Sequence, residues 1–357
     1  MEIKKTYKIL TLVLVMQWAF IQIVAQFPAF IENYYSNSLY VYISTFLRLI
    51  LGWIPFSTGD LIYAILIGYI FRSIYFTIKH KQLNLKNTFF KIGGILAVVF
   101  FIFQLNWGLN YLREPLYYRL NFTKNTYSAT ELYHFSEKLI QKVNDVQFSI
   151  TKNDTVVVEN PMNKNEIKSM AQGAYQELAK KNPQFTYENP TIKHSLFSLP
   201  LTYMGFAGYL NPITNEAQVN SLIPKNSYPA TVCHEIAHQL GIASEKEANF
   251  TGYLASTKSK DVYYNYSGYL MALRYCLYEI HENEPEKFEL LKQQLNKGVL
   301  KDMQQQQDLW RSYQNWSESF FKIFYDSFLK ANKQEAGIYG YNKVVLLLIN
   351  YHLTEEL

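Results

Sequence analysis

The pentapeptide His234-Glu235-Ile236-Ala237-His238 has residue types and spacing that suit metal chemistry. Residues four apart on an α-helix lie on one face, one turn above each other, so both imidazoles can reach a single zinc ion. Glu235 then projects over the position of a metal-bound water, where a carboxylate can act as a general base. A third ligand would leave one coordination position open for water, which is the arrangement of a catalytic zinc site.

The third ligand should follow the turn that begins near Gly241, where Glu245 and Glu247 both occur. We expect Glu247 to be the ligand, because it opens a second apolar-striped helix and can face back toward the histidines. Glu245 is the alternative. Ser244 and Glu247 also have the spacing of a capping box, in which Glu247 would only bind a backbone amide. Ser244 itself stands where a longer motif, HExxHxxGxxH, has a histidine, but serine is a poor zinc ligand.

The block from His234 to Phe250 resembles zinc metallopeptidases of the gluzincin type. The plan of the whole chain resembles an uncharacterised family of bacterial membrane proteins, catalogued as domain of unknown function 3810. The shared features are three amino-terminal spans, Trp107-Gly108-Leu109-Asn110-Tyr111 after the last span, the HExxH block, and the late segments Tyr325-Asp326 and Leu329-Lys330-Ala331-Asn332.

These resemblances imply a zincin-like domain with one zinc ion per chain, held by His234, His238 and Glu247. They imply Glu235 as the general base. The interval of nine residues from His238 to Glu247 departs from the best-known gluzincins.

Peptide hydrolysis at such a site needs a surface for the substrate and a donor for the oxyanion. The stretch 208–222 is the best candidate for an edge strand along which an extended peptide could pair, although its pattern equally fits an ordinary hairpin. Candidate oxyanion donors lie downstream, and each also has a structural interpretation in a chain with 30 tyrosines: Tyr263, Tyr264, Tyr266 and His281.

Three apolar stretches predict a helical membrane anchor, at residues 9–27, 61–76 and 92–109. The first has 19 residues without a charge, and a cleaved signal peptide is its alternative interpretation. Residues 40–53 are apolar and aromatic, and they should lie in the membrane interface or form a short re-entrant helix.

The distribution of positive charge predicts the orientation of the anchor. The link between the second and third spans is rich in lysine and has no acid, whereas the link between the first two is nearly neutral. Basic loops stay in the cytoplasm, so three spans place the rest of the chain outside. We therefore expect a multi-pass protein of the bacterial cytoplasmic membrane whose carboxy-terminal domain is extracytoplasmic, in the periplasm where a second membrane exists.

Residues 111–357 should form a soluble, mainly α, α+β zincin-like domain, separate from a membrane domain at 1–110. Ser128 and Glu131 have capping-box spacing at the start of a helix. Glycine and proline between 190 and 224 indicate short strands. Further helices are predicted at 165–181, 269–282, 285–297, 310–330 and 341–352.

Composition excludes other classes of function. The formal charge of +5 is small and dispersed, which argues against nucleic acid as a partner. Two cysteines exclude a disulfide scaffold or a thiolate zinc site.

We expect a membrane-anchored zinc metallopeptidase acting on peptide or protein substrates in the cell envelope. The alternative is a non-catalytic membrane protein whose zincin fold binds a partner. An HExxH inside the bilayer is disfavoured because charged residues flank it closely.

Overall fold

The computed structural model of the protein describes residues 5–80, 84–334 and 341–357. The chain forms two compact units. Unit 1 comprises Met1–Glu114 together with Asn211–Glu216, and unit 2 comprises Pro115–Leu210 and Ala217–Leu357. The predicted boundary after residue 110 lies close to the first change of unit. Nothing in the sequence predicted that the short segment Asn211–Glu216 belongs to unit 1.

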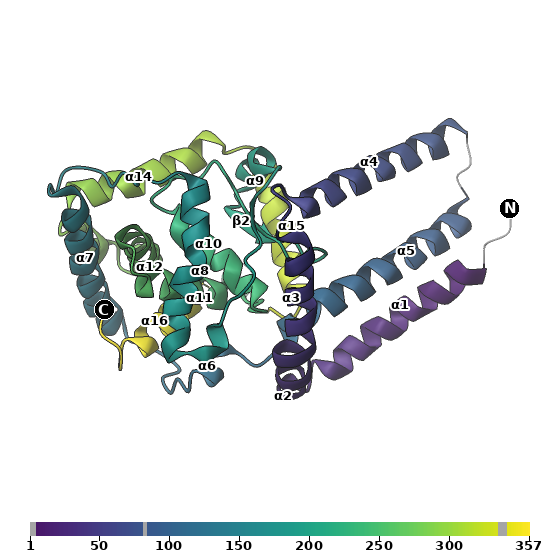
Figure 1. Ribbon diagram of the computed structural model, residues 1–357, viewed down its shortest axis with the longest axis horizontal. Coiled ribbons are helices and arrows are strands. Elements are labelled where there is room, and N and C mark those ends of the chain that lie inside the picture. Colours follow the sequence, from purple (N-terminus) through teal and green to yellow (C-terminus); the bar gives the residue numbers. More distant parts are fainter. Residues whose placement is uncertain (1–4, 81–83, 335–340) are drawn as a thin grey trace. The chain divides into compact units, whose positions relative to one another are not determined.

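Unit 1 contains three helices that are long and apolar enough to cross a membrane (Figure 1). They are α1 (Lys5–Val24), α4 (Thr58–Lys79) and α5 (Leu85–Asn106). The three predicted spans are thus confirmed as apolar helices, with ends shifted by a few residues. The helix α4 begins before the predicted span because the Ser57 hydroxyl accepts a hydrogen bond from the backbone N–H of Asp60, which caps the first turn.

The segment between the first two spans is helical from Pro28 to Leu51. It comprises α2 (Pro28–Phe30), the π-helix η1 (Ile31–Leu39) and α3 (Tyr40–Leu51). Tyr40, Ser44 and Arg48 form the buried stripe of α3, at a spacing of four residues. Apolar side chains such as Phe46 are exposed on the other side. This amphipathic pattern is typical of a helix in the membrane interface.

A buried ion pair with several hydrogen bonds lies inside unit 1, near the short helix η2 (Gly108–Leu112). Arg113 donates to both carboxylate oxygens of Glu32, through Nε at 2.8 Å and Nη2 at 2.7 Å. Asn37 accepts from Arg113 and donates to Glu32. Both charged side chains are less than one-tenth exposed. Such a buried pair is maintained only with its hydrogen bonds complete.

The segment Asn211–Glu216 binds the beginning of α4. The Glu216 carboxylate accepts the backbone N–H of Thr58 at 3.2 Å and that of Gly59 at 2.6 Å. These amides at a helix N-terminus have no partner within the helix, and the helix dipole favours an anion there. Asn215 also accepts from Arg48 at 3.1 Å. The segment is therefore an integral part of unit 1.

Unit 2 is mainly helical, in agreement with the predicted class. Both hydrogen bonds of the predicted capping box between Ser128 and Glu131 are present. Its helices are α6 (Leu116–Arg119), α7 (Ala129–Thr151), α8 (Lys164–Lys181), η3 (Pro183–Phe185), α9 (Ser198–Met204), α10 (Tyr228–Gln239), α11 (Glu245–Lys258), α12 (Val262–Asn283), α13 (Pro285–Lys292), α14 (Lys297–Ser312), α15 (Glu318–Ala331) and α16 (Tyr341–Tyr351).

The predicted helix at 310–330 is two helices. Helix α14 ends at Ser312 and α15 begins at Glu318. Between them, the Asn315 side chain accepts the backbone N–H of Ser317 and donates to the carbonyl of Tyr203 at 2.7 Å. An asparagine that bonds to nearby backbone competes with the helix ladder, which accounts for the break.

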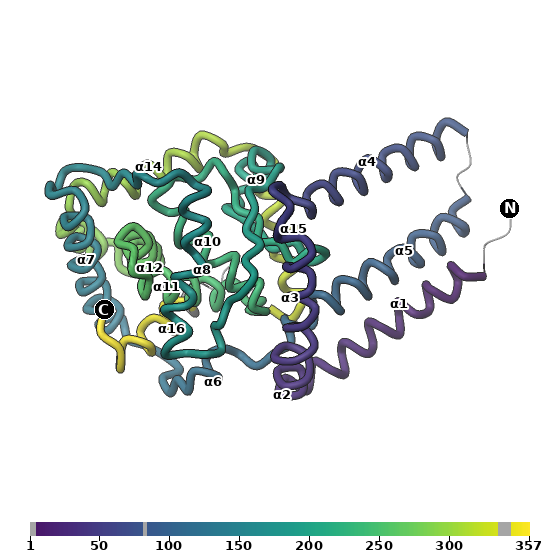
Figure 2. The backbone as a smooth tube through the Cα atoms, in the orientation of Figure 1, coloured from purple at the N-terminus to yellow at the C-terminus, as the bar shows by residue number. Residues whose placement is uncertain are grey.

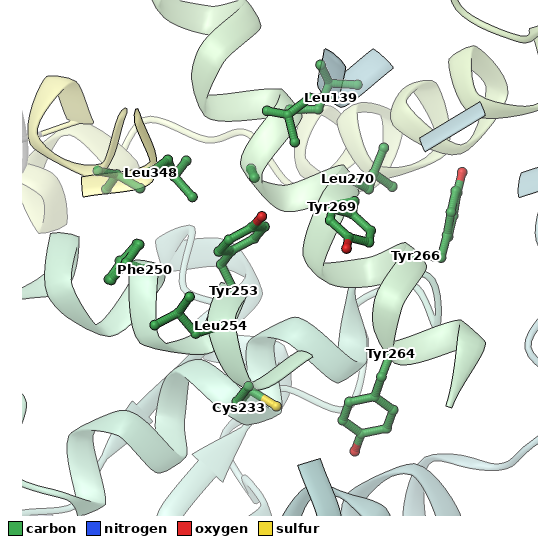
Figure 3. Packing of buried hydrophobic residues seen from close by; sticks show 14 of the residues in the cluster. Leu139, Cys233, Phe250, Tyr253, Leu254, Tyr264, Tyr266, Tyr269, Leu270 and Leu348 are labelled. Carbon is green, nitrogen blue, oxygen red and sulfur yellow. The ribbon is translucent and has the colours of Figure 1, made fainter. Parts of the chain in front are cut away.

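The core of unit 2 is built around α10, α11 and α12, which pack on one another and on α7, α8 and α16 (Figure 2). Figure 3 shows Phe250, Tyr253 and Leu254 of α11 inside this core. Cys233 and Cys276 are both free and fully buried, as small core residues should be. Buried tyrosine hydroxyls bind backbone carbonyls in the core, as in Tyr175 to Cys233 at 2.6 Å. Much of the tyrosine excess is therefore structural.

A small three-stranded sheet lies in the predicted 190–224 region. Its order is β1-β3-β2, formed by β1 (Ile192–His194), β3 (Ala217–Val219) and β2 (Gly208–Leu210). Strand β3 is parallel to β1 and antiparallel to β2, with Gly208 opposite Val219. Among the described residues, β2 has a strand on one side only. Strand β1 is the other edge, and the predicted edge strand that begins at Gly208 is β2.

Candidate metal centre

Helix α10 carries the HExxH sequence, and Gly241 ends it sharply. Gly241 has φ of 78°, a left-handed conformation that glycine adopts without steric cost. Its N–H donates to the His238 carbonyl at 2.9 Å, and the next amide, of Ile242, donates to the Ala237 carbonyl at 3.1 Å. The chain thereby turns back, and α11 packs along α10.

The two histidines meet edge to face. Their Nε2 atoms are 3.1 Å apart, and their rings are nearly perpendicular. The Nδ1 atom of His238 lies 2.7 Å from the Ile242 carbonyl oxygen. Because a carbonyl only accepts, Nδ1 must carry the proton, and the Nε2 lone pair of the neutral ring is directed toward His234. The turn at Gly241 therefore also selects the tautomer that can bind a metal.

Glu245 is the acid that faces the two histidines. Its carboxylate oxygens lie 3.3 Å from His234 Nε2 and 3.7 Å from His238 Nε2. Ligand atoms around a tetrahedral zinc ion, at bond lengths near 2.0–2.1 Å, are about 3.3 Å from one another. The two imidazole nitrogens and the Glu245 carboxylate are therefore separated by distances close to those within such a coordination shell. Glu245 is the first residue of α11, directly after the turn.

Glu247 points to nearly the opposite side of α11 from Glu245, because side chains two residues apart on a helix differ in direction by about 200°. It is 5% exposed, and its Oε1 accepts the backbone N–H of Leu116 at 3.0 Å, at the start of α6. The Ser244 side chain makes no capping hydrogen bond, so the expected capping box with Glu247 does not form. The carboxylate that the structure brings against both imidazoles is that of Glu245, whereas we expected Glu247 to do so.

Glu235 is buried between α10 and the edge strand. It is 3% exposed, and a Cβ atom placed on Gly208 would lie 2.5 Å from its Oε1. Glycine at position 208 therefore makes room for the carboxylate beside the strand. Burial raises the pKa of Glu235 to about 7, an effect opposed by the nearby histidines and reinforced by Glu245. This pKa suits a group that accepts and returns a proton near neutral pH.

The electrostatics of the cluster favour a cation. Burial alone would lower the pKa of His238, but the Glu245 carboxylate outweighs it and raises that pKa to about 9. Burial would raise the pKa of Glu245, yet the charge of His238 holds it well below its usual value. The carboxylates of Glu245 and Glu235 thus both stabilise positive charge at His238.

The donor set fits a zinc ion. His234, Glu235 and His238 offer metal-binding atoms within 4.8 Å of one another, and Glu245 adds a second carboxylate beside the histidines. Two buried polar atoms of this cluster, His234 Nδ1 and Glu235 Oε2, have no hydrogen-bond partner among the described residues. Imidazole and carboxylate together are ligands that zinc accepts.

The sequence profile of a family described as protein of unknown function, DUF3810, matches residues 35–349. The chain belongs to the DUF3810 family. No curated protein and no solved structure matches the chain.

In this DUF3810 protein, the expected oxyanion donors do not gather at the histidines. Tyr264 donates to the Ile167 carbonyl at 2.5 Å, and Tyr266 donates to Asp302 at 2.6 Å, so both hydroxyls are engaged in the core. His281 is more than half exposed and lies beside Glu282. Tyr263 packs against the hydrophobic core.

The tyrosine that reaches the cluster is Tyr325, on α15. Its hydroxyl donates to Glu245 Oε1, and its ring packs on Phe206, just before the edge strand. Nothing in its spacing could identify it, because it is 80 residues from Glu245. The one indication in the sequence was that Tyr325 lies in a segment by which the chain resembles the DUF3810 family.

Proposed function

We propose that this protein is a membrane-anchored zinc metallopeptidase of the gluzincin type. The observation that supports this most directly is the Glu245 carboxylate beside two imidazoles whose Nε2 atoms are 3.1 Å apart. Its Oε2 lies 3.3 Å from His234 Nε2, and its Oε1 lies 3.7 Å from His238 Nε2. A buried carboxylate, Glu235, adjoins the two imidazoles on the same helix. Two imidazoles, one carboxylate and a neighbouring base are the components of a hydrolytic zinc site.

The proposed ligands are His234, His238 and Glu245. Glu247 remains the alternative third ligand that the sequence favoured, and the geometry argues for a supporting role instead. Its carboxylate accepts the Leu116 amide and so holds the start of unit 2 against α11. Glu245 already stands at ligand spacing from both histidines.

When bound, zinc would lower the pKa of a coordinated water and polarise the scissile carbonyl. The residues of the chain perform the remaining tasks. Glu235 takes the proton of the attacking water on its carboxylate and passes it to the leaving amine. Its burial excludes bulk water from that proton. The edge strand β2, against which Glu235 packs, offers backbone groups for an extended peptide at the same place.

We also propose that unit 2 lies outside the cytoplasm. Helix α4 begins at Thr58 and α5 ends at Asn106, so both of these ends belong to the same side of the membrane if both helices span it. The link between the other two ends carries the lysines and should stay in the cytoplasm. A reporter that fluoresces only in the cytoplasm, fused after Leu357, tests this orientation. A bright fusion would overturn it.

The test of the activity uses the full chain, purified in detergent. We expect about one zinc per chain, and hydrolysis of a quenched fluorescent peptide library that is lost with a chelator and restored with zinc. Glu235→Gln is the matched control, because it should keep the zinc and lose the hydrolysis. A chain without zinc would overturn the metal centre. Zinc without hydrolysis of any peptide would favour the alternative, a zincin-like fold that binds a partner without catalysis.

A further inference from the structure

Helix α15 has an exposed apolar face. Phe320, Ile323 and Phe324 are 63%, 68% and 65% exposed, and Trp316, just before the helix, is 91% exposed. Within α15, the intervals of three and one residues place Phe320, Ile323 and Phe324 on one side of the helix. Scattered exposed apolar residues are ordinary, but a group of four large ones marks a contact surface.

The opposite face of α15 belongs to the protein interior. Leu329 is 1% exposed, and Tyr325 binds Glu245 of the metal centre. Tyr325 lies about 140° around the helix from Phe320, by helical geometry. The polar flank carries two ion pairs, Lys322 with Glu318 and Lys330 with Asp326. One helix thus separates a candidate active site from an uncovered apolar stripe.

The neighbouring helix α9 also exposes apolar side chains. It packs against α15. Leu196, Leu199 and Tyr203 in and before α9 are 59%, 51% and 45% exposed. The connection is fixed by Asn315, whose side chain donates to the Tyr203 carbonyl at 2.7 Å. Two connected helices therefore both expose large apolar side chains.

We propose that the apolar face of α15, formed by Trp316, Phe320, Ile323 and Phe324, lies in the headgroup region of the lipid bilayer. An amphipathic helix with aromatic residues on one side and lysines on its flanks is suited to the membrane interface. The bilayer is also within reach, because the last candidate span ends at Asn106 and unit 2 begins at Pro115. The chain thus keeps unit 2 close to the membrane that the candidate spans would cross.

This surface also indicates a class of substrate, a step that rests on the proposed function. Because α15 holds Tyr325 against Glu245, the lipid surface would lie one helix diameter, about 10 Å, from the metal centre. Substrates would then be peptide segments close to the membrane surface, such as the parts of membrane-anchored proteins that emerge from the bilayer.

The test uses the full chain in phosphatidylcholine vesicles, with single cysteines that carry an environment-sensitive fluorophore. Ile323→Cys and Phe324→Cys probe the apolar face, and Lys322→Cys is the control, because it lies about 100° around the helix from Ile323 and about 160° from Phe324. Lys322 is 59% exposed, so it labels without disturbing the core. Cys233 and Cys276 are fully buried, and the unsubstituted chain measures their background.

Lipids with a quencher on the acyl chain then report contact with the bilayer. We expect them to quench the labels at 323 and 324 at least about threefold more than the label at 322, because only the apolar face enters the interface. Equal quenching at all three positions would overturn the proposal. Blue-shifted emission without lipid quenching would also overturn it, and would show that protein covers this face. The readout needs neither zinc nor hydrolysis, so failure of the proposed activity would leave it unaffected.

Discussion

The protein buries two charged clusters that differ in how completely they are hydrogen-bonded. In unit 1, Arg113 and Glu32 form two short bonds to each other, and Asn37 binds both. In unit 2, the cluster of His234, Glu235, His238 and Glu245 includes two buried polar atoms that find no partner within the described part of the chain. Complete pairing is typical of a cluster that supports the fold, whereas buried groups without partners need another explanation, and a ligand is one.

The comparison predicts opposite consequences for substitutions in the two clusters. Those in unit 1 should lower stability and leave zinc binding unchanged. Those in unit 2 should lower zinc binding and leave the fold intact. A variant that did both would show that the division between structural and functional clusters is wrong.

The largest effect is expected for Glu245→Gln. An amide is a poor substitute for a carboxylate zinc ligand, so zinc affinity should fall by more than the about 100-fold that loss of an outer-shell partner costs. Competition with a chelator measures it. Glu247→Gln is the matched control and should retain most of the affinity, because its carboxylate binds the Leu116 amide. The reverse outcome, with zinc lost in Glu247→Gln alone, would restore Glu247 as the ligand.

Arg113→Ala should destabilise the protein by about 3–5 kcal/mol, because it leaves the Glu32 carboxylate buried without its cation. Denaturation of the full chain in detergent measures this change. The double variant Arg113→Ala/Glu32→Gln should recover part of the loss, since the uncompensated charge is removed. Zinc content per folded chain should not change in either variant, and a fall in zinc would contradict the comparison.

Tyr325→Phe should weaken zinc binding by about 10- to 100-fold, because it removes the hydrogen bond that orients Glu245. The ring still packs on Phe206, so the thermal unfolding midpoint should stay close to that of the parent. Tyr313→Phe is a control on a tyrosine that packs on Tyr203 near the start of the same helix. If both variants behaved alike in chelator competition, Tyr325 would have no special part in the metal centre.

The smallest effect is expected for Gly241→Ala. A residue with a side chain at φ of 78° costs about 1–2 kcal/mol, so stability should fall by that amount. Gly173→Ala, inside α8, is the opposite control: its Cβ would contact nothing within 4 Å, and it should stabilise the chain by about 0.5–1 kcal/mol. Urea denaturation compares the two. A stabilising Gly241→Ala would mean that the turn after α10 differs from the one described.

Local patterns were sufficient to predict much of the secondary structure. Hydropathy located the three apolar helices, because a chain that crosses lipid needs about 20 apolar residues in succession. The spacing of Ser128 and Glu131 predicted a helix start that the structure has. Glycine and proline located the strands of the sheet. The break between α14 and α15 was missed, because it depends on a hydrogen bond from Asn315 to the distant Tyr203.

The candidate metal centre was also predictable only in part. The sequence alone was enough to place His234 and His238 on one face of a helix and Glu235 beside them, because a period of 3.6 residues is a property of the local backbone. It could not decide between Glu245 and Glu247. These acids differ by two residues, and which one faces the histidines depends on where α11 begins after the turn at Gly241 and how it packs on α10.

Tertiary structure alone brought Tyr325 to Glu245 and Gly208 to Glu235. Contacts over 80 residues, or between a strand and a helix, arise from the packing of whole elements. The same holds for the segment Asn211–Glu216, which joins unit 1 because Glu216 binds the amides at the start of α4. Short-range periodicity sets the direction of each side chain on its own element, whereas the side chain that it meets is set by the burial of apolar faces among distant elements.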